Sequence, residues 1–346
     1  MGSIGLTTET MARVARVSES TVTDLETSGP RPSIEHLPVS IFASVMGIGG
    51  LALAVAQFES ALGFASTISP IFAGLAGLLW LVLAGLYLLK LLRYPEAVQA
   101  ELDHPIRLSF FPAISIGVIL LSLNLLPYSV LGATVAFWVA VVGQIAFTLI
   151  ILNRWLHHEH FKVEHHSPAW FIPVVANVLI AVPGAQLGYT EVSYFFFAVG
   201  TILWLPMLGV ALNRAFFFAG LPGKLRPTLF VMIAPPALIF LAWVELKSRA
   251  LDDFAVVLFF FALFVVLMLV SQFQYFLRLE FGLSWWSFTF PLTAVTIAAF
   301  TFYSIVPQIH YLIIALSLFT VTFLVVVMVS VLTIRSAILG KICLPD

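Results

Sequence analysis

The chain has 346 residues, of which 61% are hydrophobic and only 10% charged, and its formal net charge is -1. This composition excludes an ordinary soluble globular domain, and the near-zero charge gives no support to nucleic-acid binding. Its continuous apolar runs are typical of membrane-spanning helices and not of outer-membrane barrels, whose strands alternate apolar with polar residues.

Hydropathy and turn signals predict an all-α polytopic membrane protein with ten transmembrane helices. In chain order their ranges are 37–57, 68–92, 106–126, 131–153, 168–187, 191–217, 226–246, 253–279, 284–304 and 309–337. We expect a transmembrane channel domain over residues 36–337, an N-terminal tail over 1–35 and a short C-terminal tail over 338–346. An even number of spans places both tails on the same side of the membrane.

Basic residues indicate which side that is. Of the 16 Lys and Arg residues, all except Lys247 and Arg249 fall on the side that holds both tails. The positive-inside rule therefore predicts cytoplasmic termini for a multi-pass protein of the cell membrane, inner or plasma.

Two residue types recur in step with the spans. Every even-numbered span ends in an arginine, namely Arg93, Arg154, Arg214, Arg278 and Arg335. Every odd-numbered span contains a proline, namely Pro38, Pro112, Pro173, Pro235 and Pro291. The pattern predicts a helical hairpin of about 60 residues that is repeated five times in parallel orientation.

The odd-numbered spans also carry the small and polar residues, whereas the even-numbered spans are thickly apolar. A proline removes a backbone donor, so a membrane helix that contains one is tolerated where it is buried in protein or lines a polar path. We therefore predict five kinked inner helices around a central pore and five outer helices. Candidate pore-lining or kink positions are Pro38, Gly47, Phe111, Pro112, Pro173, Asn177, Pro235, Pro291 and Thr293. The alternative is that these residues only allow close helix packing.

The ninth span concentrates these features, because it contains Pro291 and several Ser and Thr residues. Phe290 stands directly before the proline. Our hypothesis is that the Phe290 ring partly closes the pore as a gate. The alternative is ordinary packing of this ring between helices.

The centre of every predicted span lacks Asp, Glu, Lys, Arg and His. Proton pumps and ion-coupled carriers usually need a titratable group there, so a passive facilitator is favoured. All odd-numbered helices begin on the cytoplasmic side, where their partially positive N-terminal ends favour anions. The arginines that end the even-numbered helices add positive charge at this cytoplasmic mouth, although each also complements its own helix C-terminus.

The run from His157 to His166 contains five of the eight histidines and raises the question of a metal site. The other histidines are His36, His104 and His310, each isolated in the sequence. We interpret the run as a solvated cytoplasmic loop, and we predict no metal, no cofactor and no enzymatic activity. The single cysteine, Cys343, excludes a disulfide within one subunit.

The segment from Trp285 to Thr293 resembles the Trp-Trp-x-x-[Thr/Ser]-Phe-Pro segment of the tellurite-resistance/dicarboxylate transporter family, which includes plant slow-type anion channels and their bacterial homologues. Phe110-Phe111-Pro112 and Asn213-Arg214 extend the resemblance, which runs from about His36 to Arg335. It implies a homotrimer whose subunits each have a pore, occluded by a phenylalanine that aligns with Phe290.

These observations predict an anion channel or uniporter that passes small inorganic anions such as chloride or nitrate through the lipid bilayer. The resemblance leaves open a carrier or exporter of dicarboxylates, sulfite or tellurite oxyanions. A membrane scaffold without transport is the third class, and the five kinked spans argue against it.

Overall fold

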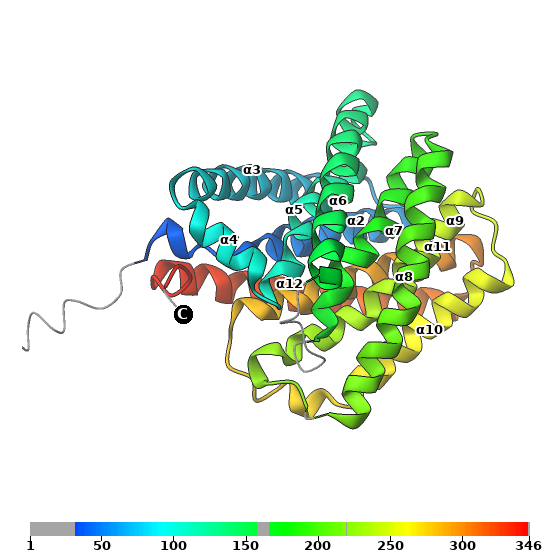
Figure 1. Ribbon diagram of the computed structural model, residues 1–346. Helices are drawn as coiled ribbons and strands as arrows, with labels where there is room; N and C mark the ends of the chain where they lie inside the picture. The colour runs from blue at the N-terminus through cyan, green and yellow to red at the C-terminus, as the bar shows by residue number, and fades with distance from the viewer. Residues whose placement is uncertain (1–31, 158–165, 219, 345–346) are drawn as a thin grey trace, which may run out of the picture.

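The computed structural model describes residues 32–157, 166–218 and 220–344, and Figure 1 shows a bundle of helices. Within this part of the chain, ten helices are long and apolar enough to cross a membrane. The predicted all-α membrane fold is therefore confirmed.

The spanning helices are of two kinds. The first kind is a single long α-helix: α3 (Ser69–Arg93), α6 (Val130–His157), α8 (Thr190–Phe217), α10 (Asp253–Val270) and α12 (Ile309–Ile338). The second kind begins with a 3-10 segment that continues into an α-helix: η2 (Val39–Phe42) with α2 (Ala43–Ala61), η3 (Arg107–Phe110) with α5 (Pro112–Leu125), η5 (Pro168–Trp170) with α7 (Phe171–Gln186), η6 (Gly223–Ile233) with α9 (Ala234–Leu246), and η8 (Leu283–Trp285) with α11 (Trp286–Ile305).

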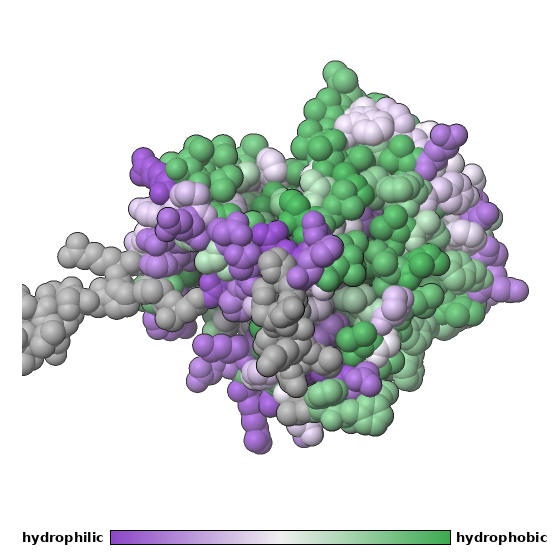
Figure 2. All heavy atoms as spheres, in the orientation of Figure 1, coloured by the Kyte–Doolittle hydropathy of each residue, from purple (hydrophilic) through white to green (hydrophobic). Residues whose placement is uncertain are grey.

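Burial separates the two kinds. In the spans that begin with a 3-10 segment, 67% to 94% of the most apolar window is buried, against 17% to 33% in the single long helices. The first set is thus the inner layer and the second the outer layer. Figure 2 shows the apolar side chains that cover the outward faces of α3, α6 and α8, as a lipid-facing surface requires.

The inner helices form a closed ring. Each packs against the next in chain order, α2 on α5, α5 on α7, α7 on α9 and α9 on α11, and α11 returns to α2. Each outer helix packs against the inner helix that precedes it in the chain. This arrangement is consistent with five parallel hairpins around an axis.

The prolines of the inner layer mostly mark where a helix begins. Pro112 and Pro235 lie at the first two positions of α5 and α9, and Pro173 lies in the first turn of α7. A proline there removes a donor that has no partner within the helix in any case. Pro291 differs because it lies inside α11, where the carbonyl of Ser287 loses its usual donor.

The eighth span is shorter than predicted. We expected a helix over 253–279 that ends in Arg278, but α10 ends at Val270, and turns with the short η7 (Phe273–Tyr275) follow. Its 18 residues extend about 27 Å, which already approaches the thickness of the hydrocarbon core. Among the described residues, two short helices lie outside the predicted spans, namely η1 (Ile34–His36) and α4 (Pro95–Asp103).

A buried ion pair fixes the start of the first inner span. Lys90 Nζ lies 2.8 Å from Glu101 Oε2, and the two side chains are 2% and 3% exposed. Lys90 also donates to the carbonyl of Leu37, and Glu101 accepts from the backbone N–H of Val39. The pair therefore joins α3 and α4 to the backbone on either side of Pro38.

The closest approach within the inner ring is between α2 and α11. A Cβ atom added to Gly50 would clash with Thr293 Oγ1 and lie 3.0 Å from Thr293 Cβ. A Cβ atom added to Gly47 would clash with Thr289 Oγ1. Glycine is required at both positions because threonine side chains of α11 pack directly against the backbone of α2 there.

We predict that Gly50→Ala lowers the free energy of unfolding by about 1 to 3 kcal/mol, as overpacking of a tight contact does. The same substitution in a Thr293→Ala background should cost clearly less, because the clashing hydroxyl is gone. Gly74 on α3 has nothing within 4 Å, so Gly74→Ala is the control and should be neutral or slightly stabilising. Thermal unfolding in detergent measures all four proteins, and equal losses for Gly50→Ala in both backgrounds would contradict the contact.

Candidate functional site

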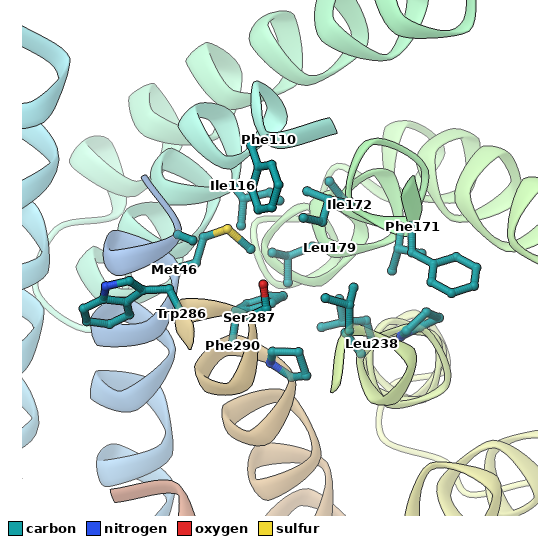
Figure 3. A pocket seen from close by; sticks show the side chains of 17 residues that line it. Met46, Phe110, Ile116, Phe171, Ile172, Leu179, Leu238, Trp286, Ser287 and Phe290 are labelled. Atoms are coloured by element: carbon teal, nitrogen blue, oxygen red, sulfur yellow. The ribbon is translucent and has the colours of Figure 1, made fainter. Parts of the chain in front are cut away.

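A narrow cavity lies inside the ring of inner helices. Every inner span contributes to its wall, as Figure 3 shows for the labelled side chains. The lining residues are Ala43, Met46, Phe110, Ile116, Phe171, Ile172, Val175, Ala176, Leu179, Val231, Ala234, Pro235, Leu238, Trp286, Ser287, Phe290 and Pro291. The cavity therefore lies on the axis about which the inner helices are arranged.

The cavity lies near the N-terminal ends of the inner α-helices. Ala43, Phe171, Ala234 and Trp286 are the first residues of α2, α7, α9 and α11, and all four line it. Ile116 lies in the second turn of α5 and completes the set. The N–H groups of these four first residues donate to carbonyls of the preceding 3-10 segments, so any positive charge at these helix ends comes from the aligned peptide dipoles and not from free N–H groups. The dipoles of these helices therefore favour an anion in the cavity, and none of its lining residues has an ionisable side chain.

The wall itself is almost entirely apolar. Ser287 contributes the one side-chain hydroxyl among the lining residues. The indole N–H of Trp286 does not serve the cavity, because it donates to Thr333 Oγ1 on α12 at 2.9 Å. An anion in the cavity would be attracted by the helix dipoles and would have no charged side chain as a ligand.

Large apolar side chains stand around the cavity at one position on each inner helix. Met46, Ile116, Leu179, Leu238 and Phe290 come from α2, α5, α7, α9 and α11. Phe290 is 8% exposed and has no aromatic ring partner in the described part of the chain. Phe288, two residues earlier, packs against Phe230 with ring centroids 4.7 Å apart. The Phe290 ring thus differs from its neighbour, because it borders the cavity and belongs to no aromatic cluster.

The structure places two of the predicted pore-lining residues in this wall, Pro235 and Pro291, together with the predicted gate residue Phe290. Phe111 does not line it, since its ring packs against Tyr87 and Phe147, and Phe110 lines it instead. Pro38, Pro112 and Pro173 lie at the starts of their helices and are not in the wall.

Gly47 and Thr293 belong to the contact between α2 and α11 and are not in the cavity wall. The Thr293 hydroxyl donates to the carbonyl of Phe290 at 2.7 Å, within its own helix. Its role in the structure is to pack against Gly50, directly behind the wall.

Asn177 faces an outer helix. Its side chain is fully buried and exchanges hydrogen bonds with Thr148 on α6 at 3.1 and 3.2 Å. Gln144, also on α6, accepts from Ser115 on α5 at 2.7 Å and donates to the carbonyl of Pro173 at 3.3 Å. This polar network braces α5 and α7 against α6 inside the membrane.

The arginines that end the outer helices do not line the cavity. Arg93, Arg278 and Arg335 are exposed, and Arg154 is paired with Asp103 at 3.4 Å. Arg214 is buried, with 8% exposure. Arg278 lies eight residues beyond the end of α10, so it does not end this helix as predicted.

The histidine run is only partly described, because residues 158–165 lie outside the described residues. His157 is exposed, but His166 is 2% exposed and its ring lies 5.1 Å from the Trp170 ring, so this end of the run is not solvated as predicted. Burial, with a smaller effect from Arg214, lowers the pKa of His166 to about 4, so it is neutral at pH 7. In the described part of the chain, no group of three His, Cys, Asp or Glu side chains could hold a metal ion.

Sequence reasoning missed Met46, Ile116, Leu179 and Leu238. Their identities carry no signal, because apolar residues fill every span. A positional signal exists: Ile116, Leu238 and Phe290 are each the fifth residue of their α-helix. The prolines concealed this register, because they occupy different positions in the different inner helices.

Comparisons with known proteins agree on one family. The family model described as "SLAC1: Voltage-dependent anion channel" matches residues 36–334. The chain is 28% identical over 323 residues to the S-type anion channel SLAH2 of Arabidopsis thaliana, which covers 91% of this chain and 62% of that protein. It is 29% identical over 322 residues to SLAH3 of the same plant, with 91% and 51% covered. It thus spans only about half to three fifths of these plant relatives.

A bacterial relative is matched over more of its own length. The tellurite resistance protein TehA homolog of Haemophilus influenzae is 26% identical over 294 residues, which cover 85% of this chain and 88% of that protein. The region that the family model matches, residues 36–334, includes the ring of inner helices.

Asn177 and Leu179 provide a direct test of which side chains form the wall, because they lie two residues apart on α7. We predict that Asn177→Ala lowers the free energy of unfolding by about 1 to 3 kcal/mol, since the buried hydrogen bonds between Asn177 and Thr148 are lost, and leaves ion flux unchanged. Leu179→Ala should increase ion flux, because it widens the cavity. Thermal unfolding and ion efflux from liposomes measure the two effects, and altered flux through Asn177→Ala without loss of stability would reverse the assignment.

Proposed function

The chain belongs to the voltage-dependent anion channel family SLAC1, and we propose that it is a channel or uniporter for small monovalent anions such as chloride and nitrate. Membership in the family supports anion transport across a membrane. The particular anions, the gate and the assembly are the proposal.

The observation that carries the proposal is the cavity surrounded by the N-terminal ends of inner helices. Their positive potential favours an anion over a cation without a fixed charge that would bind the anion tightly. Conduction needs this balance, because an ion must enter readily and also leave. A weakly hydrated monovalent anion fits an apolar wall better than a divalent oxyanion, whose dehydration costs more.

Phe290 is proposed as the gate. Its ring borders the cavity beside Pro291, which fixes the local backbone, and within the described residues it has no aromatic ring partner, although it packs in the hydrophobic core. The edge of an aromatic ring is weakly positive, so it tolerates a passing anion.

Transport is proposed to be passive and driven by the anion gradient, since the centres of the spans lack titratable groups. The whole unit over residues 36–337 is proposed to assemble as a homotrimer in the cell membrane, with both tails cytoplasmic. The positive-inside charge distribution supports this orientation.

A carrier or exporter of tellurite, sulfite or dicarboxylate oxyanions is the second candidate, and similarity to a tellurite resistance protein homolog favours it. Purified protein in a planar bilayer separates the two candidates. Unitary currents indicate a channel, whereas slow saturable flux without unitary events indicates a carrier.

We predict that Phe290→Ala raises anion conductance at least tenfold and leaves the protein well folded, because the ring obstructs the path without holding helices together. Phe288→Ala is the matched control, since it removes the same ring two residues away from an aromatic cluster. This control should cost about 3 to 5 kcal/mol of stability and give no gain in current. Unchanged conductance of a stable Phe290→Ala protein in the bilayer would exclude the gate.

A further inference from the structure

The outer end of the ring poses an electrostatic problem for an anion. The inner helices end there, so their C-terminal carbonyl groups give the outer mouth a partial negative charge. In the sequence, the ends of the spans on this side carry five acidic residues, Glu59, Glu191, Glu245, Asp252 and Asp253, and only the two cations Lys247 and Arg249. An anion that enters from this side therefore needs a local source of attraction.

An unusual turn positions one of these cations. Where α9 ends, Ser248 and Arg249 have φ angles of 52° and 65°, and they are the only non-glycine residues with positive φ in the described part of the chain. The Arg249 N–H donates to the carbonyl of Val244 at 2.7 Å, which is the backbone closure of a Schellman motif.

Other inner helices end in the same motif but with glycine. After α2, Gly63 has φ of 73° and the N–H of Phe64 donates to Glu59. After α7, Gly188 has φ of 85° and the N–H of Tyr189 donates to Gly184. Only α9 replaces the glycine by serine and continues the left-handed conformation into the next residue. A local conformation that side chains disfavour indicates a functional constraint on the residue that it positions.

The turn directs Arg249 across to the neighbouring inner helix. Its guanidinium Nη2 donates to Ser304 Oγ at 3.1 Å, at the end of α11. Ser304 follows Phe290 by 14 residues, which is nearly four helical turns, so it lies only about 40° around α11 from the face of the proposed gate. Figure 1 places the loop between α9 and α10 at the right, far from the C-terminus at the left.

The two cations of this face are not equivalent. Lys247 Nζ lies 4.6 Å from the centre of the Trp243 ring, and the Trp243 indole donates to the carboxylate of Asp252 at 3.0 Å. Its charge is therefore close to an opposite charge. Arg249 forms no ion pair with a carboxylate in the described part of the chain, and the guanidinium is exposed to solvent.

We propose that Arg249, held by this turn onto the end of α11, attracts small monovalent anions to the outer mouth of the pore and so determines how fast they enter from that side. The inference rests on the proposed function. Ser304 positions the guanidinium and does not itself attract the ion.

The experiment uses the full chain with Phe290→Ala, so that the pore conducts, in planar bilayers with potassium chloride. At about 0.01 M salt, where charges act over roughly 30 Å, Arg249→Gln should reduce chloride entry from the outer side about two- to threefold. That factor is the Boltzmann factor for the Coulomb attraction between two unit charges that lie roughly 8 Å apart in water. Chloride entry from the inner side should change less, and the difference should vanish at about 1 M salt.

Three controls separate charge from structure. Arg249→Lys keeps the charge and should retain most of the entry rate, whereas Lys247→Gln removes a charge beside Asp252 and should have a smaller effect. Ser304→Ala removes the hydrogen bond but not the charge, so entry should fall by less than in Arg249→Gln. In Arg249→Cys, a cationic thiosulfonate added from the outside should restore entry and an anionic one should lower it further, since Cys343 is expected on the opposite, cytoplasmic side.

The outcomes distinguish the two proposals. If the Phe290→Ala protein conducts and Arg249→Gln conducts equally in both directions at low salt, this inference is wrong and the proposed function stands. Equal effects of the cationic and anionic reagents would also overturn it, because an effect that arises from a change of structure does not depend on the sign of the added charge. If the Phe290→Ala protein passes no anion from either side, the proposed function fails and this inference fails with it.

Discussion

The structure depends on how helices satisfy their backbone hydrogen bonds where no water is available. A helix leaves its first N–H groups without partners, and in hydrocarbon such groups are costly unless they face protein or a polar path. The inner helices begin with 3-10 segments that extend into the layer, so their α-helical N-termini meet around one enclosed space. The same arrangement points the positive ends of the helix dipoles at that space, which favours an anion there.

Hydrogen bonds between buried polar side chains, and glycines at close contacts, fix the helices of the ring against one another. Gln144 and Thr148 on α6 bind groups of α5 and α7, and Thr322 on α12 bonds Thr296 on α11 at 2.8 Å. Gly47 and Gly50 let side chains of α11 pack directly against the backbone of α2. The outer helices therefore do more than face lipid, since they brace the inner helices against displacement.

Much of the architecture could be predicted because hydropathy and charge are properties of whole segments. The ten spans, the two layers and the class of protein follow from apolar length and from the alternation of small, polar and bulky spans. Positions of single side chains could not be predicted in this way. A threonine or asparagine in an inner helix indicates burial, but not whether it faces the axis or a neighbouring helix, as Thr293 and Asn177 show. The end of α10 was misplaced because the apolar turns after Val270 have the composition of a helix.

The central claim is that helix N-termini around an apolar cavity select anions without a charged side chain. The reversal potential of the Phe290→Ala protein in a tenfold potassium chloride gradient tests it most directly. The account predicts a reversal potential close to the chloride equilibrium value, and this value should persist when the arginines at the ends of the outer helices are neutralised singly. A reversal potential near zero, or one displaced toward the potassium equilibrium value, would contradict it.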